Sequence, residues 1–354
     1  DVKGVKVKEK TPPPIGLLFA MLPVLKKMAK YSGMAVSEYA GRFKNPAIRL
    51  LLKNVIGEDY NAAGLLFTLA TFASGDGGYP EGGSLAMAGR MADKFCTLGG
   101  EIHYRTEVEK VLVRDGAARG VLVGGEEIPA DAVIVTRDTL SAIDTLFDEP
   151  IHEPWADEMR AKTKPTLDTF VCLGVEADLS DLPEGMMVEL AKPIDCGGIP
   201  LNVIGFRNYA SYAGYAPKGC SALTLAVVGD NYDFWKARRE DVTYKEEKQK
   251  FAESFIEALS EQFPQIRGKV AVWDVATPLT YERYLGSYKG SWMTAMPKGE
   301  TNRRYPNKPE SIQNLYFAGQ RLTTPGGVPV AVTSGRAAAQ YLCLDQDMVF
   351  QGAK

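Results

Sequence analysis

The residues that could do chemistry gather near the C-terminus, where an apolar run precedes a turn rich in glycine and proline. Residues 314–320 read NLYFAGQ, and residues 324–335 read TPGGVPVAVTSG. The first run predicts a short strand over 315–318, and Gly326 and Gly327 let the backbone come close to a bulky ligand. Pro329 suits the first turn of a helix, which we predict over about residues 328–344. The positive end of that helix would favour a ligand that gains negative charge during a reaction.

This segment closely resembles the C-terminal flavin-binding segment of the phytoene desaturase, carotenoid isomerase and retinol saturase family, which belongs to the amine-oxidase-like superfamily. Three more stretches resemble that family. They are GGYPEGGS over 77–84, the strand set over 106–113, 120–123 and 130–135, and ATPLTYERY over 276–284 with Gly290 and Ser291. The resemblance covers roughly residues 34–339. It implies FAD, which becomes negative at N1 and the C2 carbonyl when reduced.

The resemblance also implies site residues. The candidate cofactor contacts are Gly82, Gly83, Val108, Gly319, Gln320, Gly326, Gly327, Val328, Pro329 and Val330. Val108 matches the position whose backbone meets the adenine, although it is equally a strand core residue. Gln320 could supply amide donors near the ribityl-phosphate region or be an ordinary polar loop residue, and Ser84 could simply cap a helix.

The candidate substrate-pocket residues are Tyr281, Tyr284 and Tyr288, which could equally form a packed tyrosine-rich turn. No catalytic acid or base is assigned. A flavin accepts the hydride at N5 itself, and the protein supplies position and electrostatics. With only two histidines and five scattered cysteines, the chain predicts neither a metal site nor disulfides.

One expected motif has no match in the sequence. A flavoprotein of this kind opens with a strand, G-x-G-x-x-G and a helix that cradle the FAD pyrophosphate. The nearest stretch, residues 75–80, has proline at the sixth position and follows a helix-like run. We therefore expect a C-terminal portion of a longer enzyme that lacks at least one βαβ unit, roughly 30 residues or more. The alternatives are half of a split enzyme completed by another chain, or a non-catalytic fragment. In each case the chain alone should bind FAD weakly or not at all.

The bulk composition narrows the class of protein. The chain has 354 residues, 45% hydrophobic and 24% charged, which is ordinary for a globular protein of about two domains. A net charge of −3 gives no reason to expect nucleic acid as a partner. Unpaired cysteines fit a reducing compartment, so we expect a cytoplasmic protein. No apolar run reaches about 18 residues, which argues against a membrane-spanning helix.

The patterning predicts an α/β (α+β) fold, and the resemblance implies that a partial FAD-binding Rossmann-like domain is interleaved with a substrate domain of mixed sheet and helices. The substrate domain would comprise residues 1–72, which are helical, and 139–301; the FAD-binding domain would comprise 73–138 and 302–354. Asn61 should cap a helix over 62–72, and another should run over 83–98. Strands are predicted over 101–104, 108–114, 120–123, 133–135, 170–175, 186–190, 201–206, 222–228 and 270–275, with a long amphipathic helix over 242–263.

Two enzyme classes follow from the resemblance. The first is an FAD-dependent oxidoreductase that desaturates, saturates or isomerises an apolar polyene or isoprenoid. The second is an amine-oxidase-like or protoporphyrinogen-oxidase-like flavoenzyme. Leu-, Met- and Phe-rich helices over 15–72 would border an apolar tunnel, unless they only form a core face. With Lys26, Lys27 and Lys30 nearby, they predict weak, reversible association with a membrane surface.

Overall fold

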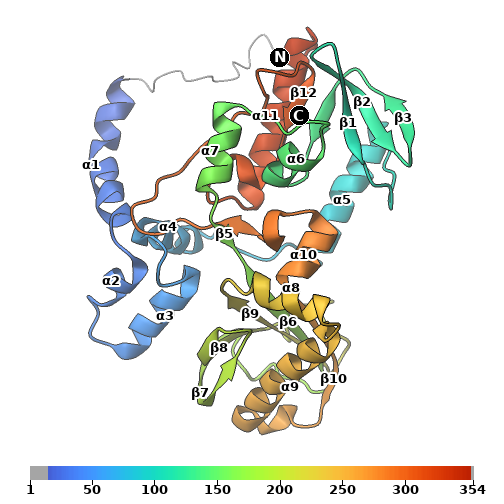
Figure 1. Cartoon of the computed structure of the whole chain (residues 1–354). Coiled ribbons are helices and arrows are strands. Elements are labelled where there is room, and N and C mark those ends of the chain that lie inside the picture. Colours follow the sequence, from blue (N-terminus) through green and yellow to red (C-terminus); the bar gives the residue numbers. More distant parts are fainter. Residues whose placement is uncertain (1–14, 352–354) are drawn as a thin grey trace.

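The computed structural model describes residues 15–351, so the charged, Pro-rich stretch over 1–14 lies outside the described residues. It opens with four helices, α1 (Ile15–Ser32), α2 (Val36–Ala40), α3 (Pro46–Ile56) and α4 (Ala62–Ala73). Helix α4 begins as predicted, because the Asn61 side chain accepts a hydrogen bond from the Gly64 N–H at 2.9 Å. Helices α2, α3 and α4 share a small core in the blue lobe of Figure 1.

A five-stranded sheet fills the lower part of Figure 1, with strand order β10-β6-β9-β8-β7. Its strands are β6 (Asp168–Val175), β7 (Gly185–Asp195), β8 (Pro200–Asn208), β9 (Ser221–Val228) and β10 (Val270–Ala276). All four pairings are antiparallel, so the prediction of a mixed sheet is wrong. Neighbours such as β7 and β8 are joined by a turn too short for the crossover that parallel strands require.

One face of this sheet packs against α9 (Tyr244–Gln262), which confirms the predicted long helix. Its buried Phe251, Phe255 and Leu259 recur at four-residue spacing and meet inward residues of the strands. A separate helix, α8 (Tyr232–Glu240), precedes it and was not predicted, and η1 (Pro264–Ile266) follows it. The opposite face of the sheet is open at Val228 and Val272.

The upper part of the molecule is organised around two parallel strands, β4 (Val133–Val135) and β12 (Leu315–Phe317). Helix α11 (Val328–Asp345) contributes Ala338 to a core with Tyr316 and Ala318. A second core next to the strands receives α6 (Thr139–Thr145) and α7 (Pro154–Lys162). Beside it lies an antiparallel sheet of β1 (Lys110–Arg114), β2 (Ala117–Val123) and β3 (Glu126–Pro129). The predicted strand 315–318 and helix 328–344 are both confirmed.

Helix α5 (Gly83–Thr97) has no buried residue, although it carries large apolar side chains. Leu85 is 85% exposed and Leu98 is 74% exposed. The strand predicted over 101–104 is absent, so that prediction is wrong. A strand needs a hydrogen-bonded neighbour, and among the described residues no hydrogen bond between two backbone groups involves residues 101–104. This part of the upper unit is therefore uncovered.

The chain crosses between the upper and lower parts at a short pair of strands, β5 (Pro165–Thr166) and β11 (Met293–Thr294). Helix α10 (Pro278–Leu285) and the turn η2 (Tyr288–Gly290) precede the return strand β11, and η3 (Gln320–Leu322) follows β12. This agrees with an interleaved chain path. The four domain boundaries given above stay a prediction.

A buried ion pair joins the ends of β4 and β12 to the return strand β11. Arg321, from η3, is 3% exposed, and its Nε donates to Asp138 Oδ2 at 3.0 Å. Its other nitrogens donate to Thr294 Oγ1 at 3.0 Å and Ser291 Oγ at 2.7 Å. Asp138 also accepts from the Ser141 N–H and so caps α6. One guanidinium thus links the ends of β4 and β12 to the strand returning from the lower sheet.

We expect Arg321→Met to lower the free energy of unfolding by about 3–5 kcal/mol, because it leaves the Asp138 carboxylate buried without its partner. The matched control is Lys110→Met, which breaks the surface pair of Lys110 with Asp148. That change should cost about 1 kcal/mol or less. Urea unfolding of both variants measures the difference, and equal losses would contradict a central role for Arg321.

Candidate functional site

The turn between β12 and α11 has a backbone that side chains would obstruct. Gly326 has φ +111° and Gly327 has φ +94°, both in the region that favours glycine. A Cβ on Gly326 would lie 3.1 Å from both the carbonyl oxygen and the side-chain oxygen of Gln320. That same side-chain oxygen accepts a hydrogen bond from the Gly327 N–H at 3.1 Å. Gln320 therefore shapes the turn, a role that the sequence did not reveal.

The start of α11 offers unused donors beside this turn. Among residues 15–351, no acceptor pairs with the N–H groups of Val328 and Val330, while Pro329 has none to offer. Val328 is 59% exposed, Pro329 is exposed too, and Val330 is partly buried. The other end of the turn is rigid, since Ser334 Oγ accepts from the Gly319 N–H at 2.9 Å and donates to the Gly319 carbonyl at 3.1 Å. N–H groups without an acceptor at the start of a helix suit a ligand that carries or gains negative charge.

Three other predicted cofactor contacts, Gly82, Gly83 and Val108, come from earlier parts of the chain. Gly82 and Gly83 have φ +72° and +79° and form the start of α5, where Gly82, not Ser84, holds the N-cap position. Val108 precedes β1 and is 37% exposed. Within the described residues, no hydrogen bond joins these residues to the turn of Gly326 and Gly327. Their assignment as cofactor contacts stays a prediction.

The three candidate pocket tyrosines have different surroundings. Tyr281 is partly buried on α10 near Asp168. Tyr284 is 72% exposed, with the Arg283 guanidinium over its ring at 5.2 Å. Tyr288 packs against the core beside β4 and β12. A pocket shared by all three gains no support from these positions, and Tyr281 is the one with chemistry next to it.

Asp168, at the start of β6, is a buried carboxyl group that the sequence did not single out. It is 7% exposed, and its Oδ1 has no hydrogen-bond partner among the described residues. Burial raises the pKa of this carboxyl to about 6, against a smaller opposing effect of the Tyr281 hydroxyl. A group with that pKa can hold or release a proton near neutral pH. An aspartate that begins a strand gives no sequence signal of this kind.

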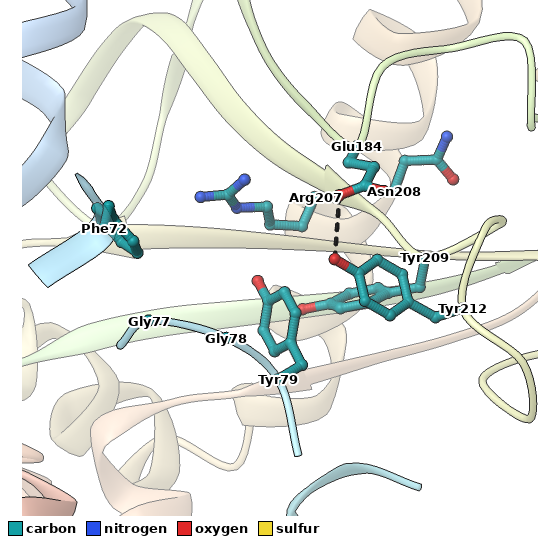
Figure 2. Close-up of a pocket in the computed structure, with 9 residues that line it drawn as sticks. All are labelled: Phe72, Gly77, Gly78, Tyr79, Glu184, Arg207, Asn208, Tyr209 and Tyr212. Carbon is teal, nitrogen blue, oxygen red and sulfur yellow. Dashed lines mark hydrogen bonds between the residues drawn. The ribbon is translucent and has the colours of Figure 1, made fainter. Parts of the chain in front are cut away.

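Sequence reasoning also missed a cavity of about 320 Å³ at the edge of the lower sheet, shown in Figure 2. Tyr79, Tyr209 and Tyr212 line it together with Arg207 and Glu184. The spacing of three between Tyr209, Tyr212 and Tyr215 was the available signal. Tyr79 comes from the distant connection between α4 and α5, which only the fold brings to the other rings.

The family can now be identified. The family model of flavin containing amine oxidoreductases matches residues 25–343. The chain belongs to this family. The match spans helix α5, the described sheets and the turn into α11.

Curated relatives of this flavin oxidoreductase chain include enzymes named for carotenoid substrates. It is 26% identical to a 4,4'-diapophytoene desaturase from Methylomonas sp, over 78% of this chain and 56% of that protein. It is also 26% identical to a chloroplastic prolycopene isomerase from Daucus carota, over 75% of this chain and 44% of that protein. The chain thus spans about half the length of the curated relatives it matches.

Solved structures share the fold at lower identity. Cyclohexylamine oxidase from Brevibacterium oxydans aligns with a TM-score of 0.54 at 14% identity, covering 96% of this chain and 77% of that one. An oxidoreductase from Methanosarcina mazei aligns with a TM-score of 0.57 at 16% identity, covering 93% and 72%. These likenesses confirm the predicted α/β fold class.

We expect Asp168→Asn to change how stability depends on pH. The folded pKa of about 6 exceeds the ordinary 3.8, so between these values the folded state binds more protons than the unfolded state. Stability contributed by this group therefore falls as pH rises from about 4 to 6, by on the order of 2 kcal/mol. Urea unfolding at pH 4.5 and 7 should show a smaller pH-dependent loss in Asp168→Asn than in the native protein. An identical pH dependence would show that the carboxyl is not buried as described.

Proposed function

We propose that the protein containing this chain is an FAD-dependent oxidoreductase that acts on an apolar polyene or related isoprenoid. The observation that carries the proposal is the turn of Gly326 and Gly327 at the start of α11. This turn brings together two glycines at positive φ, the Gln320 side chain that supports them, and N–H groups that find no acceptor among the described residues. Family membership supports a flavin as the ligand, and FAD is the form that the sequence resemblance implies.

The bound flavin would supply a hydride acceptor at N5. This chain's residues would bind and orient it. The N–H groups of Val328 and Val330, at the positive end of α11, would favour negative charge on the ligand. Gln320 would keep the turn open by holding the Gly327 N–H. Asp168 is near enough to Tyr281 to influence its hydroxyl and could exchange a proton at neutral pH.

The substrate class rests on relatives and on exposed apolar surface. Relatives named as desaturases and isomerases of carotenoids favour a long apolar substrate. Helix α1 carries exposed Phe19, Leu22 and Leu25, close in sequence to Lys26 and Lys27. Apolar side chains beside lysines suit weak contact with a lipid surface, from which a polyene could be collected. In the described residues, no helix is long and apolar enough to cross a membrane.

An amine substrate is the second candidate. Solved structures titled as cyclohexylamine and putrescine oxidases share the fold. The specific observation in its favour is Glu184 at the edge of the tyrosine-lined cavity, because a carboxylate among aromatic rings suits an ammonium group. Arg207 lines the same cavity and opposes a cation there.

We further propose that another strand–turn–helix unit completes the flavin site, supplied by the same protein or by a complementary chain. Among described strands, β4 pairs with β12 alone, and a parallel sheet is normally covered on both faces. The apolar side chains of α5, including Met91 and Phe95, are exposed as well. A parallel strand along β4 would pair with its open edge, and the apolar face of α5 is a further surface that added structure would cover. If nothing covers them, the chain would be a non-catalytic fragment.

We expect residues 1–354 alone to bind FAD with a dissociation constant weaker than about 1 μM, because no pyrophosphate-cradling loop is present in the sequence. Adding a strand–turn–helix polypeptide with a G-x-G-x-x-G turn should tighten binding at least tenfold. Titration followed by flavin fluorescence measures both. Gly327→Val should abolish that gain, since valine fits poorly at φ +94°, and Gly124→Val in the turn between β2 and β3 is the control. Tight binding by the chain alone would contradict the need for a completing unit.

The substrate class is tested with the completed, FAD-loaded protein under anaerobic conditions. We expect a C40 polyene in liposomes to bleach the flavin absorbance, and cyclohexylamine to leave it unchanged. The protein should also float with the liposomes in part, and Leu22→Ser with Leu25→Ser should reduce that fraction by about half or more, because burial of each leucine is worth roughly 1.5–3 kcal/mol. Bleaching by the amine alone, with no flotation, would favour the amine-oxidase reading.

A further inference from the structure

The tyrosine-lined cavity is built from segments far apart in the chain (Figure 2). Arg207 comes from the outer face of β8, and Glu184 directly precedes β7. Tyr209 and Tyr212 lie in the connection after β8, and Tyr79 in the connection between α4 and α5. Phe72, Gly77, Gly78 and Asn208 also line it. The residues that would contact a ligand there all come from this chain.

Arg207 is the free cation of this cavity. Among residues 15–351, no carboxylate lies within 4.0 Å of its guanidinium and no acceptor takes its hydrogen bonds. Its β7 neighbour is Gly185, and a Cβ there would lie 2.5 Å from the Arg207 Nη1. The absence of a side chain at Gly185 therefore gives the guanidinium its place over the strand.

Both oxygens of the Glu184 carboxylate already accept hydrogen bonds from within the protein. One oxygen of Glu184 accepts from Ser211 Oγ at 2.9 Å, and the other accepts from the Tyr212 hydroxyl at 3.0 Å. Burial, with smaller effects of neighbouring tyrosines, raises the pKa of the Tyr79 hydroxyl to about 12, so Tyr79 stays neutral beside Arg207. The cavity thus offers the unpaired donors of Arg207, while each oxygen of Glu184 already accepts one hydrogen bond from within the protein.

The rings form an apolar wall next to these donors. Tyr79 stands edge-on to Tyr209 and Tyr212, with ring centroids 5.4 Å apart in both pairs. Tyr215 stacks on Tyr209 at 5.0 Å. A Cβ on Gly83 would lie 3.4 Å from the Tyr215 hydroxyl, so this cluster reaches the turn that begins α5. The wall therefore runs from Arg207 toward a predicted flavin contact.

We propose that this cavity binds the carboxylate end of an apolar, unsaturated chain. The carboxylate pairs with the Arg207 guanidinium, and the carbons next to it pack against the rings of Tyr79, Tyr209 and Tyr212. Arginine suits this role because its planar fork matches a carboxylate. That the ligand is a substrate rests on the proposed function, but the binding itself does not. A substrate with one acidic end would be held by that end while its chain extends toward the flavin side.

Binding is measured on flavin-free protein with cis-parinaric acid, a polyene carboxylate that becomes more fluorescent when bound, and with its neutral methyl ester. We expect the acid to bind at least tenfold tighter than the ester. Arg207→Gln should remove this preference. Gly185→Ala should weaken acid binding severalfold while the arginine remains, because the new Cβ displaces the guanidinium. Glu184→Gln should strengthen acid binding, since it removes a like charge from the cavity. Arg42→Gln, at an exposed arginine outside the cavity, should change nothing.

Three results would overturn the proposal. The first is equal affinity for acid and ester. The second is an acid preference that survives Arg207→Gln in a variant whose thermal melt is unchanged. The third is displacement of the probe by octadecylamine more effectively than by stearate, with Glu184→Gln weakening the amine, which would assign the cavity to cations. Flavin bleaching is recorded separately on the completed protein. If the flavin is not bleached but the preference for the acid over the ester persists, the proposed redox function is wrong and the carboxylate site is still supported.

Discussion

The structure depends on one buried guanidinium. Arg321 lies where the chain leaves β12, and Asp138 lies where it leaves β4, so their ion pair ties the carboxyl ends of the two parallel strands together. Ser291 and Thr294 bring the returning strand β11 to the same group. Burying a charge is costly unless every donor finds an acceptor. This requirement fixes how the lower sheet meets the upper unit, and the turn of Gly326 begins only five residues after Arg321.

That constraint explains why the glycine turn can stay open. A turn with two residues at positive φ would collapse or vary in shape without support. Here Arg321 anchors its first part, Gln320 holds the Gly327 N–H, and Ser334 ties the start of the turn to the body of α11. The donors at the start of α11 are thus presented by a rigid frame. Preorganised donors are those that stabilise charge with little rearrangement.

Sequence patterns predicted the fold well wherever local signals agree with the final packing. The strand of Tyr316, the helix that begins at Val328 and the helix capped by Asn61 all lie within a residue or two of their predicted bounds. The patterns failed where a result depends on a distant partner. Residues 101–104 have a strand composition but no neighbouring strand, and the pairings of β6 with β9 and β10 in the antiparallel sheet join strands far apart in the chain.

In the candidate site, too, features set by local sequence could be predicted and features set by distant contacts could not. Gly326 and Gly327 could be predicted because a glycine pair before Pro329 has a local meaning. The bracing role of Gln320, the raised pKa of Asp168 and the meeting of Tyr79 with Tyr209 could not, since each depends on residues brought together only by the fold. The pocket predicted at Tyr284 stays a prediction, because its side chain is 72% exposed and no pocket wall among the described residues surrounds it.

The two proposed binding surfaces of this chain differ in which elements form them. The cavity around Arg207 has walls from the connection after α4, from the start of β7 and from the end of β8, all held by the packed lower sheet and its helix α9. The surface around Gly327 follows β12, whose partner β4 pairs with no further strand among the described residues. If the two proposals hold, the organic ligand is recognised by residues of this chain, while a flavin at the turn of Gly327 would gain from a unit that pairs with β4. Because burial of apolar surface stabilises the structure that it encloses, a strand added along β4 should stabilise β12 and the turn that follows it, and leave the Arg207 cavity unchanged.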